Sequence, residues 1–233
     1  MLIITSRHTE KDLLLWKEYE EIDVINSYSE KKIDCAKEVI SQYNIKYNDV
    51  VSYTSWGKDS IILLHLIAGM KLKMPVVYVR FYDRDNPDCD LVRDAFLKKY
   101  DLNYYEESYD YKRVRAKGLH WKETAEKYGH HRITGIRNDE SGRRLLVWKQ
   151  FGFYSENTCR PLSLLTNQEV FAYIHKNELP LCPVYGYLGG GRWPRENIRT
   201  HSLAGSSADG FGRSEWEREY YPDILAIIKK GIQ

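Results

Sequence analysis

The strongest constraint on the fold is a regular alternation of β-rich and helix-periodic segments in the first part of the chain. The expected strands cover residues 49–53, 75–81, 103–107 and 132–136. The helices expected among them cover residues 59–70 and 89–100. Alternation at this spacing is typical of βαβ units, in which helices join parallel strands. The sequence therefore predicts an α/β fold with an open, mostly parallel twisted sheet and helices on both faces.

Helical signals also flank this alternating core. Apolar residues at helical spacing over residues 29–43, with Ser29 or Ser27 available as a cap, predict that a helix comes first. A capping box at residues 166–169 predicts a helix that runs through His175. A short helix is expected near the end of the chain, over residues 223–230.

The segment over residues 186–213 differs in composition from the rest of the chain. It is rich in glycine, serine and arginine and has little periodicity. Long segments of this kind inside compact domains are usually functional loops or disordered. We therefore expect an α/β domain over residues 1–185, including a helical lead-in. A C-terminal loop and short helical extension over residues 186–233 should pack on the same domain.

The composition excludes several classes of protein. The chain has 233 residues, enough for one domain with a full core, and 42% of them are hydrophobic. Its four cysteines are scattered with no CxxC pair, which argues against zinc ribbons, iron–sulfur clusters and disulfide frameworks. The longest apolar stretch, residues 61–69, is too short to span a bilayer, and the first residues lack signal-peptide features. We therefore expect a cytoplasmic protein with no membrane segment.

The hexapeptide SWGKDS, Ser55–Ser60, lies where the first strand ends and the next helix begins. Open parallel sheets bind ligands at this edge, and the N–H groups at a helix start favour an anion. The lysine charge and the two serine hydroxyls add donors. The Walker pattern GxxxxGK[ST] is absent. From these residues alone, a phosphate site and a turn in which Asp59 merely caps the helix remain equally open.

Three motifs in the same order resemble the PP-loop ATP pyrophosphatases (adenine nucleotide α-hydrolase-like), which bind ATP and cleave its α–β bond. Ser55–Ser60 is similar to their SGGxDS signature. Residues 133–144 (ITGIRNDESGRR) resemble the GxRxxES..R segment of one branch, and residues 159–185 resemble its later segment that begins P-L-x-x-W-T. That branch contains phosphoadenylylsulfate (PAPS) reductase, the small subunit of ATP sulfurylase and the DNA-phosphorothioation ATPases. The resemblance covers residues 29–185 and implies a Rossmann-like, nucleotide-binding PP-loop domain.

The resemblance also implies which residues bind the nucleotide, whose pyrophosphate the loop would cradle. These are Ser55, Trp56, Gly57, Lys58, Asp59, Ser60, Val79, Phe81, Gly135 and Arg137, with the backbone near Val79 and Phe81 contacting adenine. The catalytic residues that it implies are Lys58, Asp59, Arg137 and Arg144. Asp59 would also help to hold Mg²⁺ that accompanies the phosphates.

Further residues are expected around the reacting anion or the acceptor. The resemblance implies Asp139, Glu140, Ser141 and, beside Arg144, Arg143. For Arg143 and Arg144 a solvated pair at a helix start is the alternative. Three arginines and a histidine around three glycines favour a second phosphate or acceptor loop; they are Arg192, Arg195, Arg199 and His201. A flexible linker explains this segment equally well.

Departures from the family pattern limit the reaction that we expect. Trp56 replaces a small residue of the loop, which predicts a reshaped site or a ring that stacks on a ligand. Arg80 stands where the family often has an acidic residue that contacts metal or ribose. The carboxyl-terminal E-C-G-L-H motif of the PAPS reductases is missing, and reduction of a sulfonucleotide needs a thiolate. We therefore do not expect reduction by an internal cysteine.

The expected function is cleavage of ATP to AMP and pyrophosphate, with adenylation of an acceptor oxygen that sulfur or nitrogen then replaces. The expected cofactors are ATP and Mg²⁺, with PAPS or adenylylsulfate (APS) as the alternative nucleotide. One alternative is a sulfonucleotide enzyme that uses an external thiol, and another is a non-catalytic nucleotide-binding subunit. A sulfur-donor partner protein and a homodimer stay open, and the net charge of +2 gives no indication of a nucleic-acid acceptor.

Overall fold

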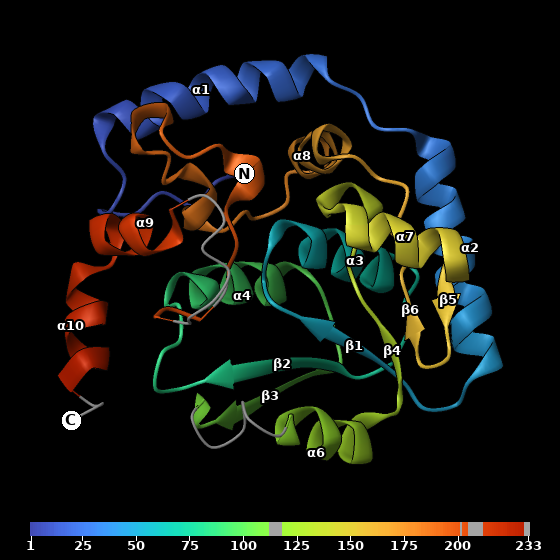
Figure 1. The fold of residues 1–233 in the computed structure, drawn as a ribbon. Coiled ribbons are helices and arrows are strands. Elements are labelled where there is room, and N and C mark those ends of the chain that lie inside the picture. The colour runs from blue at the N-terminus through green and yellow to red at the C-terminus, as the bar shows by residue number, and fades with distance from the viewer. Residues whose placement is uncertain (112–117, 201, 205–211, 231–233) are drawn as a thin grey trace.

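A six-stranded sheet with strand order β3-β2-β1-β4-β6-β5 organises the protein (Figure 1). The computed structural model describes residues 1–111, 118–200, 202–204 and 212–230. The strands are β1 Val50–Thr54, β2 Val76–Phe81, β3 Tyr104–Tyr109, β4 His131–Ile133, β5 Tyr154–Ser155 and β6 Thr158–Cys159. All neighbouring strands are parallel except β5, which is antiparallel to β6. The predicted α/β class with an open, mostly parallel sheet is confirmed.

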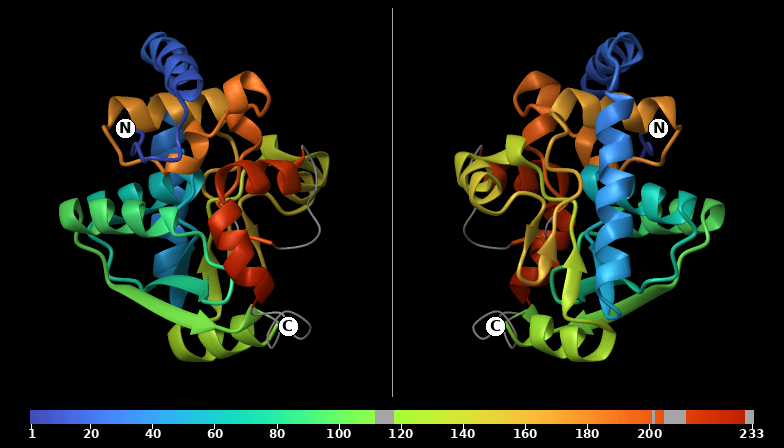
Figure 2. Two further views of the ribbon diagram at one scale, coloured as in Figure 1. Left: turned by 90° about the vertical axis from the view of Figure 1, so that its left-hand side faces the viewer. Right: turned by 90° about the vertical axis from the view of Figure 1, so that its right-hand side faces the viewer.

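Helices cover both faces of the sheet, as predicted. The helices α3, Lys58–Gly69, and α4, Asp88–Lys99, lie on one face, and α6, Leu119–Tyr128, lies on the other (Figures 1 and 2). Tyr53 of β1 ties α6 to the sheet, because its hydroxyl donates to Thr124 Oγ1 at 3.0 Å.

Two predicted helices begin at the caps that the sequence indicates. Helix α2, Glu30–Lys46, starts after Ser29, whose side chain accepts a first-turn N–H. Helix α8, Asn167–Lys176, starts with the reciprocal capping box of Thr166 and Glu169. Each cap satisfies backbone N–H groups that have no partner inside the helix.

One helix precedes α2, so the prediction that the helix over residues 29–43 comes first is wrong. Helix α1, Glu10–Ile25, packs against α8 and has no single apolar face. Its Leu14 and Ile25 are exposed, whereas Asp12 and Asp23 are buried. The helix was not predicted because its interior is made in part by acidic residues whose partners lie far away in the sequence.

Three further elements follow β3 and were not predicted. They are α6, the helix α7 Gly142–Phe151, and the β5–β6 hairpin. None of the residues of α7, all of which the structure describes, is buried. A helix without a buried face leaves no apolar periodicity in the sequence. A short 3-10 turn, η1 Asn138–Glu140, leads into α7.

The described part of residues 186–213 is largely irregular, as expected. The 3-10 turn η2 Pro183–Gly186 leads into it, and it contains the 3-10 turns η3 Gly189–Gly191 and η4 Arg195–Asn197. Residues 201 and 205–211 of the predicted loop lie outside the described residues. The chain continues with α9 Arg213–Tyr220 and α10 Pro222–Lys230, which confirms the final helix. No helix in the described ranges has the length and apolar character that crossing a membrane requires.

Candidate functional site

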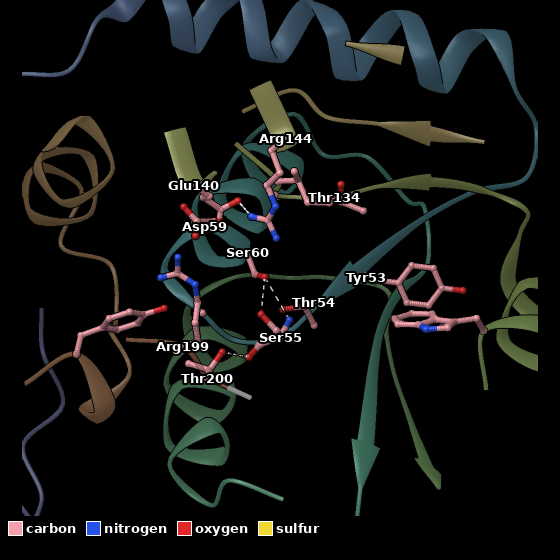
Figure 3. Close-up of a pocket in the computed structure, with 15 residues that line it drawn as sticks. Tyr53, Thr54, Ser55, Asp59, Ser60, Thr134, Glu140, Arg144, Arg199 and Thr200 are labelled. Atoms are coloured by element: carbon pink, nitrogen blue, oxygen red, sulfur yellow. Dashed lines mark hydrogen bonds and ion pairs between the residues drawn. The ribbon is translucent and has the colours of Figure 1, made fainter. Parts of the chain in front are cut away.

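A pocket lies at the carboxyl end of the sheet between β1 and β4 (Figure 3). The strand order reverses here, because β2 and β3 lie on one side of β1 and the later strands on the other. Open α/β sheets bind ligands at such switch points. The cavity has a volume of about 320 Å³, which suits a small molecule. Of the predicted site residues, those that line it are Ser55, Gly57, Asp59, Ser60, Gly135, Glu140, Arg144 and Arg199.

The loop after β1 presents polar groups to this pocket. The hydroxyl oxygens of Ser55 and Ser60 lie 3.2 Å apart. Gly57 is the N-cap residue of α3, and it has no side chain to occupy the first-turn N–H groups. A Cβ atom on Gly57 would lie 3.0 Å from Thr200 Oγ1 and 3.1 Å from Tyr185 Oη. Glycine is therefore required by crowding. The N–H of Lys58 already donates to Tyr185 Oη at 3.0 Å, so an anion at the start of α3 would be held by the other first-turn N–H groups.

Two cations hold the carboxylate of Asp59 at the floor of the pocket. Asp59 Oδ2 accepts from Lys58 Nζ at 2.9 Å, and Asp59 Oδ1 accepts from Arg137 Nε at 2.6 Å. Burial alone would raise the pKa of Asp59, but the charges of Lys58 and Arg137 bring that pKa below its ordinary value. Burial lowers the pKa of Lys58 to about 8 in spite of its contact with Asp59. At neutral pH the three groups together carry one positive charge.

Arg137 does not contact the pocket, contrary to its predicted catalytic and nucleotide-binding roles. Its side chain is fully buried. Besides Asp59, the guanidinium donates to the carbonyl of Leu165 at 3.1 Å and to Asn167 Oδ1 at 2.7 Å. Asp139 accepts the backbone N–H of Asn167 at 2.9 Å, so it fixes the start of α8 rather than facing the pocket. Arg137 is therefore a positioning residue, because its donors are occupied within the protein.

Two other arginines face the pocket directly. Arg144 forms an ion pair with Glu140. Arg199 donates from Nη1 to two backbone carbonyls of its own segment, at 2.6 and 3.1 Å. Burial lowers the pKa of Arg144, and the charge of Arg199 lowers it further. Both guanidinium groups point toward the part of the pocket where Asp59 and Glu140 lie (Figure 3).

Trp56 does not line the pocket, so the prediction that its ring contacts a ligand is wrong. The ring is fully buried and packs against Tyr78, Phe96 and Tyr104, with centroid distances of 6.4, 6.1 and 5.6 Å. Its backbone is left-handed, with φ of 55°, a conformation that is rare for a bulky residue. The left-handed turn directs the side chain into the core.

Gly135 allows the segment after β4 to approach the start of α3 closely. A Cβ atom at this position would lie 3.0 Å from the backbone carbon and oxygen of Asp59. The predicted strand over residues 132–136 ends earlier, at Ile133, and the residues after it line the pocket. The backbone of this segment is therefore part of the site.

The residues of β2 lie outside the pocket, contrary to the predicted adenine contact. The described residues that line the cavity include neither Val79 nor Phe81, which pair with β3. Arg80, the departure from the family pattern, forms ion pairs with Asp85 at 3.0 Å and Glu106 at 2.9 Å. The charge of Arg80 is thus balanced by carboxylates of the protein itself.

Two of the three arginines predicted as an acceptor loop have structural contacts instead. Arg195 is buried and donates to both carboxylate oxygens of Asp23, at 2.7 and 2.6 Å. This ion pair joins η4 to α1. Arg192 is largely exposed and pairs with Glu215. Of this group only Arg199 lines the pocket.

Several residues that line the pocket were not predicted from the sequence. Tyr53 and Trp121 form one end, with ring centroids 5.2 Å apart at 84°. Tyr185 and Thr200 lie at the loop, where Thr200 Oγ1 donates to the carbonyl of Ser55 at 2.9 Å. Tyr185 is the last residue of the third motif, so its place in that motif could have indicated that it belongs to the site. Trp121 and Thr200 lie in segments without a recognisable pattern.

The two carboxylates that line the pocket, Asp59 and Glu140, are already paired with cationic side chains. No cluster of three or more potential metal-ligating side chains occurs in the described ranges. Asp59, the predicted ligand, already forms ion pairs with Lys58 and Arg137, and Glu140 is paired with Arg144. Mg²⁺ usually takes one or two protein carboxylates beside phosphates and water. The assignment of Asp59 to Mg²⁺ is therefore not supported.

The open parallel sheet, the loop after β1 and the pocket at the switch point define an α/β protein of the PP-loop class. Residues 49–188 match the family model of the phosphoadenosine phosphosulfate reductase domain. The chain belongs to this family, within the PP-loop ATP pyrophosphatase superfamily. No curated protein matches the sequence.

Solved structures share the fold at low sequence identity. FMN adenylyltransferase from Candida glabrata in complex with ATP has a TM-score of 0.54 and 16% identity, covering 78% of this chain and 70% of its own. The same enzyme with FAD and inorganic pyrophosphate also gives 0.54 and 16%, with coverage of 76% and 68%. NMN synthetase from Francisella tularensis has a TM-score of 0.50 and 13% identity, covering 92% and 93%. These similarities concern the fold alone.

Proposed function

We propose that the protein binds ATP in the pocket between β1 and β4 and cleaves its α–β bond, so that pyrophosphate leaves. The AMP group is transferred to an oxygen of an acceptor molecule. Sulfur or nitrogen then replaces this adenylated oxygen, and AMP is released. The observation that carries the proposal is that the Ser55 and Ser60 hydroxyls lie beside the start of α3, with Arg144 and Arg199 across the pocket. The FMN adenylyltransferase structures hold ATP, or FAD with pyrophosphate, on the same fold.

The two ends of the pocket suit the two ends of the nucleotide. The β- and γ-phosphates lie at the loop, where serine hydroxyls and the N–H groups of α3 donate to them. Beneath the loop, Lys58, Asp59 and Arg137 add one net positive charge. The base lies against Trp121 and Tyr53, because the other end of the pocket offers aromatic rings.

In the reaction, an acceptor oxygen forms a bond to the α-phosphorus while the bond to the bridging oxygen of the β-phosphate breaks, and pyrophosphate leaves. Negative charge on the α-phosphate oxygens is stabilised by the guanidinium groups of Arg144 and Arg199. Fixed positive groups aimed at such charge account for much of the rate of phosphoryl transfer enzymes. Glu140 holds Arg144 in place.

The alternative of a sulfonucleotide reductase with an internal thiol has no support at this pocket. All four cysteines lie in the described residues, and none lines the cavity. Burial raises the pKa of Cys159 to about 12 and also raises that of Cys182. A thiol in this state is a poor nucleophile. An external thiol acting on bound PAPS stays as the second candidate.

Incubation of the purified protein with α-labelled ATP, with separation of AMP, ADP and adenylylated products, tests the proposal. Wild-type protein should release AMP and pyrophosphate, and Arg144→Gln should lower the rate by about 100-fold. The control is Lys149→Gln, which removes an exposed charge from the same helix and should leave the rate unchanged. ATP that binds without turnover would favour the non-catalytic subunit, and turnover of PAPS alone would favour the sulfonucleotide enzyme.

A further inference from the structure

Helix α1 reverses the usual pattern of a helix on a protein surface. Two of its three buried residues, Asp12 and Asp23, are acidic. On the opposite side Leu14, Ile22 and Ile25 are exposed, and 84% of the surface of Ile25 is accessible. A surface helix normally turns its apolar residues toward the core. Because several apolar residues are exposed along one face, and not a single one, this face indicates a partner that covers it.

The outer face of α1 is acidic as well as apolar. Glu18 follows Leu14 by four residues and Glu21 precedes Ile25 by four, so these side chains share one face of the helix. Both glutamates are exposed. The two lysines of α1 precede this acidic stretch. A partner for the second half of α1 should therefore be apolar and basic.

Helix α7 of the same chain presents a surface of this kind. Leu145, Leu146 and Lys149 share its outer face, and all three are exposed. On the opposite face, Val147 and Trp148 are only half-buried, and no residue of α7, described in full, is buried. A helix of ten residues is marginal in water without tertiary packing. A partner on the outer face would therefore stabilise α7.

We propose that α1 of one copy of this chain docks against α7 of a second copy. In an antiparallel arrangement Leu146 meets Ile25. Lys149 then meets Glu21, because each charge lies about one helical turn from the apolar residue beside it. Pairing α1 with α1 would bring Glu18 and Glu21 of both copies together, and pairing α7 with α7 would oppose two copies of Lys149. Such like charges disfavour both symmetric contacts. The inference does not depend on the proposed function.

The two surfaces lie at different places on one molecule. In Figure 2, α1 forms the top edge in blue, and α7 lies at one side in yellow. A contact between two different surfaces leaves one free α1 and one free α7 at the ends of a pair. Association therefore continues beyond a dimer into chains or closes as a ring. Since a single pair of helices buries a small area, the association should be weak and should depend on concentration.

Sedimentation velocity over a range of protein concentrations tests this contact. The α1 variant is Ile22→Asp with Ile25→Asp, and the α7 variant is Leu145→Asp with Leu146→Asp. All four residues are exposed, so both variants should fold, which circular dichroism and thermal unfolding check. We expect wild-type protein to form species larger than a dimer and each variant alone to stay monomeric. An equimolar mixture of the two variants should form a dimer and nothing larger, because each variant contributes one intact surface.

A matched control replaces two exposed isoleucines outside α1 and α7. The double variant Ile45→Asp, Ile227→Asp should associate like the wild type. The charge pair is tested with Glu21→Lys and Lys149→Glu. Each of these changes alone should weaken association by about fivefold, and their combination in one chain should restore it, since opposite charges face each other again.

Three results would overturn the proposal. The first is wild-type protein that stays monomeric at every concentration. The second is association that either the α1 variant or the α7 variant leaves unchanged, because the contact would then use another surface. The third is a mixture of the two variants that stays monomeric although each change abolishes association, because α1 and α7 would then not bind each other.

Discussion

Arg137 Nε and Asp59 Oδ1 lie 2.6 Å apart and join two segments that are 78 residues apart in the chain. The contact ties the segment after β4 to the first turn of α3, directly beneath the pocket. Because Arg137 is fully buried, its guanidinium acts on the site through Asp59 and not on a ligand. The positive charge at the floor of the pocket is therefore held in place by contacts within the protein.

Replacement of Arg137 by methionine should lower the free energy of unfolding by about 3–5 kcal/mol, because it removes one partner of a buried ion pair. Urea unfolding of the wild type and the variant measures this change. Adding Asp59→Asn to Arg137→Met should cost much less than Asp59→Asn alone, since the two residues interact. A stability loss below about 1 kcal/mol, together with a loss of ATP affinity, would mean that Arg137 contacts the nucleotide instead.

Gly135→Ala should destabilise the protein by about 1–3 kcal/mol, because the new Cβ atom would crowd the backbone of Asp59. ATP affinity should fall as well, since the loop must move. Gly142→Ala is the matched control: a Cβ atom there meets no described atom within 4 Å, and this change should stabilise α7 by about 0.4–1 kcal/mol. Thermal unfolding and nucleotide titration of the two variants would show the difference. Equal effects at both positions would contradict the close approach of the segment after β4 to α3.

Trp56→Ala should lower the free energy of unfolding by about 3–5 kcal/mol, because the ring fills the core beside α4. Trp56→Gly should be more stable than Trp56→Ala by about 1 kcal/mol, since glycine adopts the left-handed conformation at little cost. This order is the reverse of the usual one for a helix or strand. Denaturant unfolding of both variants measures it. A more stable alanine variant would show that the turn is not left-handed in solution.

The stability contributed by Lys58 should rise with pH above about 8. Burial lowers the pKa of its ammonium group to about 8 in the folded protein, against an ordinary value of 10.5. Between these two pH values the unfolded chain holds a proton that the folded protein has lost, so raising the pH favours folding through this group. Wild type should therefore gain stability relative to Lys58→Met between pH 8 and 10 in urea unfolding. A difference that stays constant or shrinks over this range would contradict the lowered pKa.

The sheet and the position of the loop could be predicted because their signals are local. β-rich runs alternate with helical periodicity, and SWGKDS falls between two of them. The caps of α2 and α8 were equally local. Helices α1 and α7 could not be found in this way, because α1 buries Asp12 and Asp23 and no residue of α7, described in full, is buried.

The roles of individual site residues depended on partners distant in the sequence. Arg195 resembled a residue of an acceptor loop until its partner Asp23, 172 residues away, was known. Trp56 was expected at the ligand, but the left-handed turn that directs it into the core has no signal in the sequence. Thr200 reaches Ser55 from an irregular segment, for which no periodicity predicts a position.

A crystal structure of the wild-type protein with bound AMPCPP tests the central claim most directly. The account predicts that the β- and γ-phosphates lie within hydrogen-bond distance of Ser55, Ser60 and the N–H groups at the start of α3. It also predicts the base against Trp121 and the α-phosphate beside Arg144. Phosphates bound elsewhere on the protein, or no nucleotide in the pocket between β1 and β4 at saturating concentration, would contradict it.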